Sequence, residues 1–182
     1  MKHKGTVYLE TDRLILRPFR REDAEAVFRN WASDPEVTKF LTWPTHTSVE
    51  MSLDYVKFCI HGYEEKTSYN WGMELRETHE LIGNISVVKI DEDTQSVELG
   101  WVTGRSWWGN GYTAEAAQRV IDFLFDEVGA NRIGARHDSN NPNSGRVMQK
   151  SGMKYEGTLR QSYRNNQGIV DCAYYSVIAA DR

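Results

Sequence analysis

The sequence predicts an α/β (α+β) fold in which a mixed, mostly antiparallel sheet of about seven strands is flanked by helices. Three observations lead to this prediction. Residues 70–102 contain three strand-like runs separated by short polar turns, which is the pattern of an antiparallel meander. Residues 97–128 form a strand–loop–helix unit followed by another strand-like run at 132–137, and such a unit places its two strands in parallel. Residues 155–179 have the pattern of a hairpin.

The first third of the chain begins with a strand-like run at 13–19 and then becomes helical. Apolar residues that recur every three or four positions predict a helix over 21–32. The pair Asp34-Pro35 suits the N-cap and the first position of a short helical turn. Residues 47–50, Thr-Ser-Val-Glu, have the spacing of a capping box, so we expect a further helix from there to near Lys66.

The rest of the chain alternates between strands and helices. The sequence contains no internal repeat, linker or low-complexity tract, so we expect residues 1–182 to form a single domain. The expected elements are meander strands at 70–75, 81–90 and 95–102, a helix after Gly111, a strand at 132–137, a helix from Pro142 to Lys150, and hairpin strands at 155–163 and 169–179.

Composition excludes several classes of protein. The formal net charge is −4, with 22 Lys and Arg against 26 Asp and Glu, so we expect no basic face of the kind that binds nucleic acid. No run approaches the ~18 apolar residues of a membrane span, and the N-terminus lacks the apolar segment of a secretory signal. The two cysteines and five histidines lack the spacing of metal ligands, so we expect no metal and two reduced thiols in a cytoplasmic protein.

The most informative stretch is the loop between the strand at 97–102 and the next helix, because this loop ends in Gly109-Asn110-Gly111. The first N–H groups of a helix have no partner within the helix, and the helix dipole makes that end positive. Glycine lets an anionic group approach the backbone closely. The sequence therefore predicts a phosphate or pyrophosphate site at residues 108–114.

Three kinds of ligand compete for this loop. Gly109-x-Gly111-x-x-Ala114 fits the dinucleotide-binding pattern, but about six residues separate it from the strand, and the meander before it is antiparallel. A nucleotide P-loop needs a lysine and then a serine or threonine after its glycines, and Tyr112-Thr113 does not supply them. The third kind is a cofactor with a pyrophosphate and a long arm that lies along the strand.

Five segments carry a resemblance to a known family. Residues 107–116, Trp-Trp-Gly-Asn-Gly-Tyr-Thr-Ala-Glu-Ala, resemble the coenzyme A loop of the GCN5-related N-acetyltransferase (GNAT) superfamily. Residues 10–17 and 97–101 are similar to the first strand and the strand before the loop in the branch that acetylates N-termini of ribosomal proteins. Residues 141–153 are similar to its Asn-x-x-Ser helix, and residues 155–160 to its sixth strand. Together these segments cover nearly the whole chain in the order of that family.

The resemblance implies an enzyme that moves an acetyl group from acetyl-CoA to a primary amine by direct attack in a ternary complex, without a metal. The acceptor it implies is a protein N-terminus or a small amine. The rival hypothesis is a non-catalytic acyl-CoA-binding sensor or interaction module. Two positions depart from the family: Ser106 stands where Gln or Arg is frequent, and Met153 where Phe is usual. These departures leave the acyl preference open.

The resemblance also implies a binding role for the backbone. The strand after Glu98 would splay from its neighbour and offer the N–H of Trp101 or Val102 to the thioester carbonyl. The pyrophosphate would bind the N–H groups at the start of the helix. The residues expected there are Trp108, Gly109, Asn110, Gly111, Tyr112 and Thr113.

Three polar side chains are the candidates for chemistry and for holding the cofactor. Glu98 is the candidate base and acceptor contact, and its alternative role is a strand carboxylate paired across the sheet. Ser144 matches the Asn-x-x-Ser motif and is the candidate that protonates the departing thiolate, with Tyr155 a weaker choice. The alternative for Ser144 is a helix-turn serine bonded to the backbone. Asn141 suits both a helix N-cap and a partner for the pantetheine amides.

The tryptophans divide into core and site candidates. Trp31, Trp71 and Trp101 fit the apolar faces of their predicted elements and are expected in the core. Trp43, next to a proline in the link between two helices, is the candidate for the wall of the acceptor pocket. An exposed strand edge in the C-terminal hairpin leaves a homodimer open.

Overall fold

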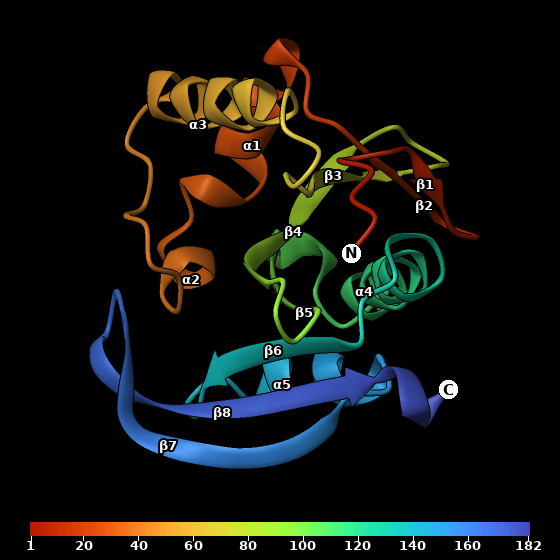
Figure 1. Cartoon of the computed structure of the whole chain (residues 1–182). Coiled ribbons are helices and arrows are strands. Elements are labelled where there is room, and N and C mark those ends of the chain that lie inside the picture. The colour runs from red at the N-terminus through yellow and green to blue at the C-terminus, as the bar shows by residue number, and fades with distance from the viewer.

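One mixed sheet runs through the computed structural model, which describes residues 1–182. Its strands are β1 (Leu9–Glu10), β2 (Leu14–Arg17), β3 (Asn70–Leu75), β4 (Leu81–Asp91), β5 (Ser96–Thr103), β6 (Arg132–Asp138), β7 (Lys154–Asn165) and β8 (Gly168–Ile178). Their order is β1-β2-β3-β4-β5-β6-β8-β7, and β5–β6 is the one parallel pair (Figure 1). The predicted fold class is therefore confirmed, including the antiparallel meander and the parallel pair at the centre.

The helices also follow the predicted order. They are α1 (Ala24–Val27), α2 (Pro35–Thr38), α3 (Val49–Gly62), α4 (Tyr112–Phe123) and α5 (Pro142–Lys150). A 3-10 turn before α1 and a π turn after it make Arg21–Ala32 continuously helical, as predicted. A π turn at Leu124–Val128 likewise extends α4 to Gly129, whose φ of 77° ends the helix.

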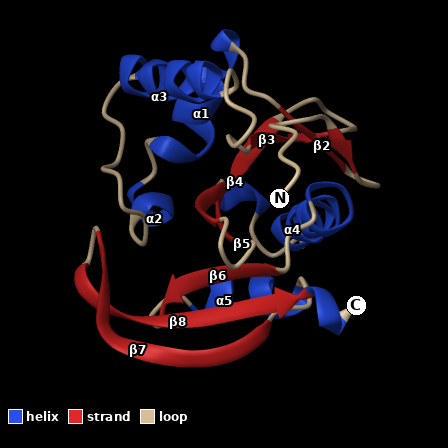
Figure 2. Ribbon diagram, in the orientation of Figure 1, coloured by secondary structure: helices blue, strands red, loops and turns tan.

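Two hydrophobic clusters lie on opposite faces of the sheet. The larger, of 26 buried residues, includes α4 residues such as Val120 and Phe123 and strand residues such as Trp71. The smaller, of 10 buried residues, joins the α1–α3 region to the sheet through Leu81 and Val102. Figure 2 shows α1 and α3 together on one side of the strands and α4 on the other. Helices cover both faces of the sheet. Since β5 and β6 are inner strands of its order, they lie in the middle of the molecule.

The predicted core tryptophans occupy the expected places, and Arg17 at the end of β2 has a structural role. Trp31 and Trp71 are buried, and Trp101 is partly buried against the larger cluster. Arg17 is buried as well, and its guanidinium bonds Asp23 at 2.8 and 2.9 Å and also pairs with Glu74. No helix is both long enough and apolar enough to cross a bilayer.

One strand was missed, and two local expectations were wrong. The short strand β1 was not anticipated, because two residues are too few for a periodic pattern. The N-cap of α3 is Ser48, without a side-chain cap bond, and the hydroxyl of Thr47 contacts the Met51 sulfur at 3.4 Å instead of closing a capping box. The helix ends at Gly62, before the expected Lys66.

Candidate active site

The parallel strands β5 and β6 separate partway along their length. Their pairing runs from Ser96 opposite Arg132 to Leu99 opposite Ala135 and stops there, although β5 continues to Thr103. The backbone of β5 beyond Leu99 is therefore unpaired on its β6 side. This is the splay that the family resemblance implies for the strand after Glu98.

Strand alternation decides which backbone groups face this gap. The N–H of Gly104 donates to Ile82 on the β4 side at 2.9 Å, whereas the carbonyl of Gln95 accepts bonds from the β6 side. Neighbouring residues of a strand direct their backbone groups to opposite sides. The N–H of Trp101 therefore faces the gap between β5 and β6, and the N–H of Val102 faces β4. Of the two residues named from the sequence, only Trp101 has a free donor.

The glycine loop leads from the gap to the start of α4. Gly109 and Gly111 have φ angles of 79° and 81°, which glycine adopts without strain. Gly111 is the N-cap of α4 and no side chain caps the helix, so the N–H groups of its first turn stay free. A Cβ added at Gly109 would meet no atom within 4 Å. The loop therefore presents open backbone beside the positive end of a helix, which suits a pyrophosphate.

Side chains within the loop fix its shape. The indole N–H of Trp108 donates to the carbonyl of Thr103 at 2.7 Å, and the ring is 45% exposed. The hydroxyls of Thr103 and Thr113 lie 2.7 Å apart, and the Asn110 amide donates to the carbonyls of Trp107 and Trp108, each at 3.2 Å. The side chains of Trp108, Asn110 and Thr113 thus shape the loop and leave the N–H groups from Gly109 to Thr113 to face a ligand. The N–H of Trp108, also named from the sequence, instead donates to the Arg105 carbonyl at 3.2 Å.

Glu98 lies at the point where the strands part, on the face covered by α1 and α3. The Nε of Arg136 on β6 is 2.8 Å from Glu98 Oε1, so the expected alternative, a carboxylate paired across the sheet, is present. The same guanidinium lies 4.5 Å from the centre of the Tyr163 ring. The Glu98 side chain is 20% exposed, and its second oxygen forms no bond within the chain. The ion pair therefore fixes Glu98 but leaves one oxygen open.

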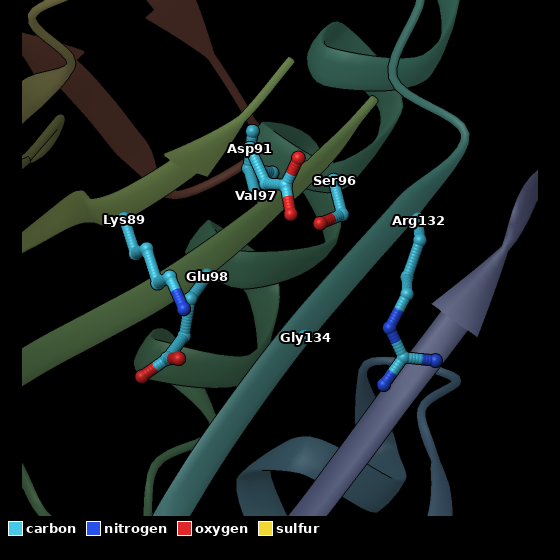
Figure 3. Close-up of a pocket in the computed structure, with 7 residues that line it drawn as sticks. All are labelled: Lys89, Asp91, Ser96, Val97, Glu98, Arg132 and Gly134. Atoms are coloured by element: carbon cyan, nitrogen blue, oxygen red, sulfur yellow. The ribbon is translucent and has the colours of Figure 1, made fainter. Parts of the chain in front are cut away.

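A small hollow of about 70 Å³ adjoins Glu98. Figure 3 shows Lys89 and Glu98 at one side of it and Arg132 at the other, with Gly134 between them. Gly134 leaves space here because it has no side chain. Asp91, Ser96 and Val97 complete the lining.

Ser144 and Asn141 lie at the start of α5. The hydroxyl of Ser144 makes no hydrogen bond within the chain, whereas Ser151 at the end of the same helix bonds the Val147 carbonyl at 2.8 Å. Asn141 occupies the N-cap position, as predicted, but its side chain makes no capping bond. Asp138 holds the turn instead, by accepting from the Asn140 N–H at 2.8 Å. Both Ser144 and Asn141 therefore keep free polar groups.

Tyr155, the weaker candidate acid, lies on a different element from Ser144 and Asn141. It is on the edge strand β7, is 56% exposed, and its hydroxyl bonds Thr158 at 2.8 Å. The arrangement therefore favours Ser144 over Tyr155.

Trp43 lies in the link between α2 and α3, on the same side of the sheet as Glu98. Its ring stacks on Tyr55 with centroids 6.4 Å apart and lies 5.1 Å from the His46 ring. The tip of the β7–β8 hairpin holds this link. The Asn166 amide donates to the carbonyls of Thr38 and Trp43 at 2.9 and 2.8 Å, and its backbone N–H donates to Leu41 at 3.0 Å.

Sequence analysis did not identify Arg136 or Asn166 as site residues. Arg136 acts across a parallel pair whose register no spacing rule predicts, and Asn166 sits in an ordinary polar turn. No group of three His, Cys, Asp or Glu side chains lies close enough to hold a metal ion. Cys59 and Cys172 are both buried free thiols.

Residues 13–154 match the family model described as an acetyltransferase (GNAT) domain. The chain is 35% identical over 170 residues to the N-acetyltransferase YoaA of Bacillus subtilis, covering 93% of this chain and 96% of YoaA. It is 29% identical over 99 residues to the ribosomal-protein-serine acetyltransferase of Escherichia coli, covering 54% and 55% of the two chains.

Solved structures agree with these matches. A GNAT-family acetyltransferase from Bacillus anthracis superposes with a TM-score of 0.83 at 28% identity, over 94% of this chain and 98% of that one. The Microcin C7 self-immunity acetyltransferase MccE, solved with acetyl-CoA and AMP, shares the fold with a TM-score of 0.82 at 17% identity, over 92% and 93% of the two chains.

Proposed function

The chain belongs to the GNAT N-acetyltransferase family, and we propose that it transfers an acetyl group from acetyl-CoA to a primary amine by direct attack. The observation that carries this proposal is the continuity of the open strand edge and the glycine loop. One unpaired backbone N–H, that of Trp101, lies on the same strand that leads into the free N–H groups of α4. A thioester with a pyrophosphate tail matches that line of donors.

Coenzyme binding rests on the backbone of the loop. The N–H groups from Gly109 to Thr113 bind the pyrophosphate, helped by the dipole of α4. The pantetheine arm lies in the gap between β5 and β6, where the free amide of Asn141 bonds it. Trp101 donates its N–H to the thioester carbonyl and stabilises the negative charge that develops on that oxygen. Loss of one such donor costs about 2.7–4 kcal/mol of barrier in other enzymes.

Two side chains move the protons. The acceptor amine attacks the carbonyl carbon and gives its proton to the open oxygen of Glu98, which Arg136 holds in place. The C–S bond breaks, and the departing thiolate takes a proton from Ser144. A free thiol has a pKa of about 8.5, so this leaving group needs only modest help. The proton taken by Glu98 then passes through solvent to Ser144 and restores both side chains. One C–N bond forms, one C–S bond breaks, and the products are an amide and a thiol.

The acceptor approaches from the Glu98 face, between the hollow at Gly134 and the link that carries Trp43. Charged groups of both signs surround this approach, namely Lys89 and Arg132 against Asp91 and Glu98. Such a lining accepts a polar primary amine, either a protein N-terminus or a small molecule. The resemblance to ribosomal-protein acetyltransferases supports the first of these, and the small size of the hollow supports the second.

An assay of coenzyme release tests the proposal. Acetyl-CoA is incubated with a panel of primary amines, including short peptides with free N-termini, and free thiol is the readout. We expect thiol release that depends on one class of amine. Tight acetyl-CoA binding without release for any amine would favour a non-catalytic acyl-CoA sensor. Absence of acetyl-CoA binding would contradict both functions.

The cellular setting and the oligomer follow as lesser parts of the proposal. Two buried free thiols suit a reducing cytoplasm. β7 ends the sheet, so its outer edge is where two copies would pair as a homodimer. Its two register shifts, after Tyr155 and after Leu159, break the regular edge and restrict that pairing. Light scattering at several concentrations measures the mass directly, and a monomer at every concentration would contradict the homodimer.

A further inference from the structure

Arg13, in the turn between β1 and β2, reaches across to the coenzyme loop although it lies 97 positions away from Asn110 in the sequence. We propose that Arg13 is a positioning residue for coenzyme binding: it holds the glycine loop from outside and neutralises Glu115 beside the pyrophosphate site. This inference rests on the proposed function, because it concerns the loop to which that function assigns the pyrophosphate.

The Arg13 guanidinium contacts both the glycine loop and the first turn of α4. Its Nη1 donates to the Asn110 carbonyl at 3.0 Å. Its Nε and Nη2 lie 2.7 and 2.6 Å from Glu115 Oε2, a paired geometry that a lysine cannot reproduce. Asn110 lies between Gly109 and Gly111, and Glu115 lies in the first turn of α4. Arg13 therefore fixes the distance between the loop and the helix that together bind the anion.

Two further contacts complete the attachment. The guanidinium carbon lies 4.4 Å from the centre of the Tyr112 ring, at the first position of the helix. Glu115 Oε1 accepts bonds from the Arg13 backbone N–H at 3.0 Å and from the Thr11 hydroxyl at 2.6 Å. The β1–β2 turn thus binds the loop through its backbone as well as its side chain.

The charge of Glu115 explains why an arginine is needed. A carboxylate in the first turn of a helix stabilises the helix dipole, but it repels an anionic ligand at the same end. Burial opposes ionisation of Glu115, but the bonds from Thr11 and Arg13 outweigh it and hold its pKa below the usual range. The carboxylate is therefore charged at neutral pH, and Arg13 supplies the cation that balances it. Without Arg13, the pyrophosphate would meet an unbalanced negative charge.

Arg13 does not make these contacts as part of the hydrophobic core. Its side chain is 46% exposed. Arg76, in the neighbouring turn between β3 and β4, has a side chain that is 47% exposed and donates to the Thr11 carbonyl at 2.9 Å, but it touches no part of the coenzyme loop. Arg76 is therefore a matched control: it has the same residue type and nearly the same exposure, and it also contacts the β1–β2 turn, but it lacks the loop contacts.

Calorimetric titration with coenzyme A tests the inference on the full chain. We expect Arg13→Ala to raise the Kd at least about tenfold, equal to about 1.4 kcal/mol, and Arg76→Ala to leave it within about twofold. Arg13→Lys, which keeps the charge but not the paired geometry, is expected to lie between wild type and Arg13→Ala. In the double variant Arg13→Ala/Glu115→Gln the repelling charge is also removed, so its Kd is expected to be about threefold lower than that of Arg13→Ala. At saturating acetyl-CoA, kcat of Arg13→Ala stays near wild type.

The outcomes separate the two proposals. An Arg13→Ala Kd within twofold of wild type overturns the role of Arg13 while leaving the proposed function intact. An equal weakening by Arg76→Ala overturns it as well, because the effect would then come from the hairpin as a whole. If wild-type protein does not bind coenzyme A, the proposed function fails first. Should Arg13→Ala fail to fold in a thermal scan, Arg13→Lys carries the same comparison.

Discussion

The coenzyme end and the acceptor end of the candidate site are built in opposite ways. At the proposed coenzyme end, consecutive residues from Thr103 to Glu115 form a loop that leaves backbone N–H groups free. At the acceptor end, the link that carries Trp43 is held by Asn166, 123 positions further along the chain, and the groups that face the site are side chains. Backbone donors suit a ligand that is the same in every turnover, whereas side chains can be changed to suit a particular amine.

Loss of the proposed base, Glu98, should lower kcat more than any other change and should leave the binding of both substrates nearly unchanged. Glu98→Gln is expected to lower kcat by about 100-fold, within the range for general base catalysis, with little change in either KM. Steady-state rates with acetyl-CoA and the best amine measure this. Glu156→Gln is the control, because Glu156 is another strand carboxylate paired with an arginine, Arg132. Equal losses in the two variants would show a structural role for such pairs and contradict Glu98 as the base.

The coenzyme end is tested most sharply at its N-cap glycine. Gly111→Ala places a Cβ at a φ of 81°, and the left-handed conformation costs a non-glycine residue about 1–2 kcal/mol. We expect the Kd for acetyl-CoA to rise about tenfold or more, because the loop relaxes away from the binding shape.

Gly129→Ala provides the comparison for Gly111→Ala. Gly129 has a φ of 77° at the other end of the same helical segment, and an added Cβ would meet no atom within 4 Å. Its substitution should lower the Tm similarly without changing the acetyl-CoA Kd. If both variants weaken coenzyme binding equally, general strain rather than loop geometry sets the affinity.

Ser144 in α5 and Ser151 at the C-cap of this helix separate an effect on the reaction rate from an effect on stability. Ser144→Ala should lower kcat about tenfold, less than a typical general acid, because a thiolate is already a good leaving group. Its Tm should not change, since its hydroxyl bonds nothing in the chain. Ser151→Ala should do the reverse: it loses a hydrogen bond to Val147, worth about 1 kcal/mol, and keeps its kcat. A normal rate for Ser144→Ala would remove it from the mechanism.

The acceptor end should respond to the hairpin tip. Asn166→Ala removes two side-chain hydrogen bonds, each worth about 1 kcal/mol, and frees the link that carries Trp43. The expected result is a KM for the amine that rises about fivefold, with the KM for acetyl-CoA unchanged; Trp43→Ala should give the same pattern. Gln167, in the same turn, bonds only through its backbone, so Gln167→Ala should have no effect. A raised acetyl-CoA KM in Asn166→Ala would contradict the separation of the two ends.

The contrast between the ends also explains what sequence analysis could predict. The glycine loop, its helix and the parallel strand pair follow from the pattern of about forty consecutive residues, where local conformational preferences apply. The partner of Glu98 depends on the register of β5 against β6, and the place of Asn166 depends on how a distant hairpin folds back. Arg13 lay in a segment that matched the family, but its target, Glu115, could be identified only from the packed structure. Long-range contacts between single side chains leave no periodic trace in the sequence.

The most direct test of the account is a two-substrate kinetic analysis in which acetyl-CoA and the best amine are varied together. Burial raises the pKa of the Cys59 thiol to about 11 and raises that of Cys172, so neither thiol is ionised to accept the acetyl group at neutral pH. The proposed direct transfer requires both ends of the site to be filled at once, so we expect double-reciprocal lines that intersect. Parallel lines would indicate a covalent acyl-enzyme and would contradict direct transfer between the two ends.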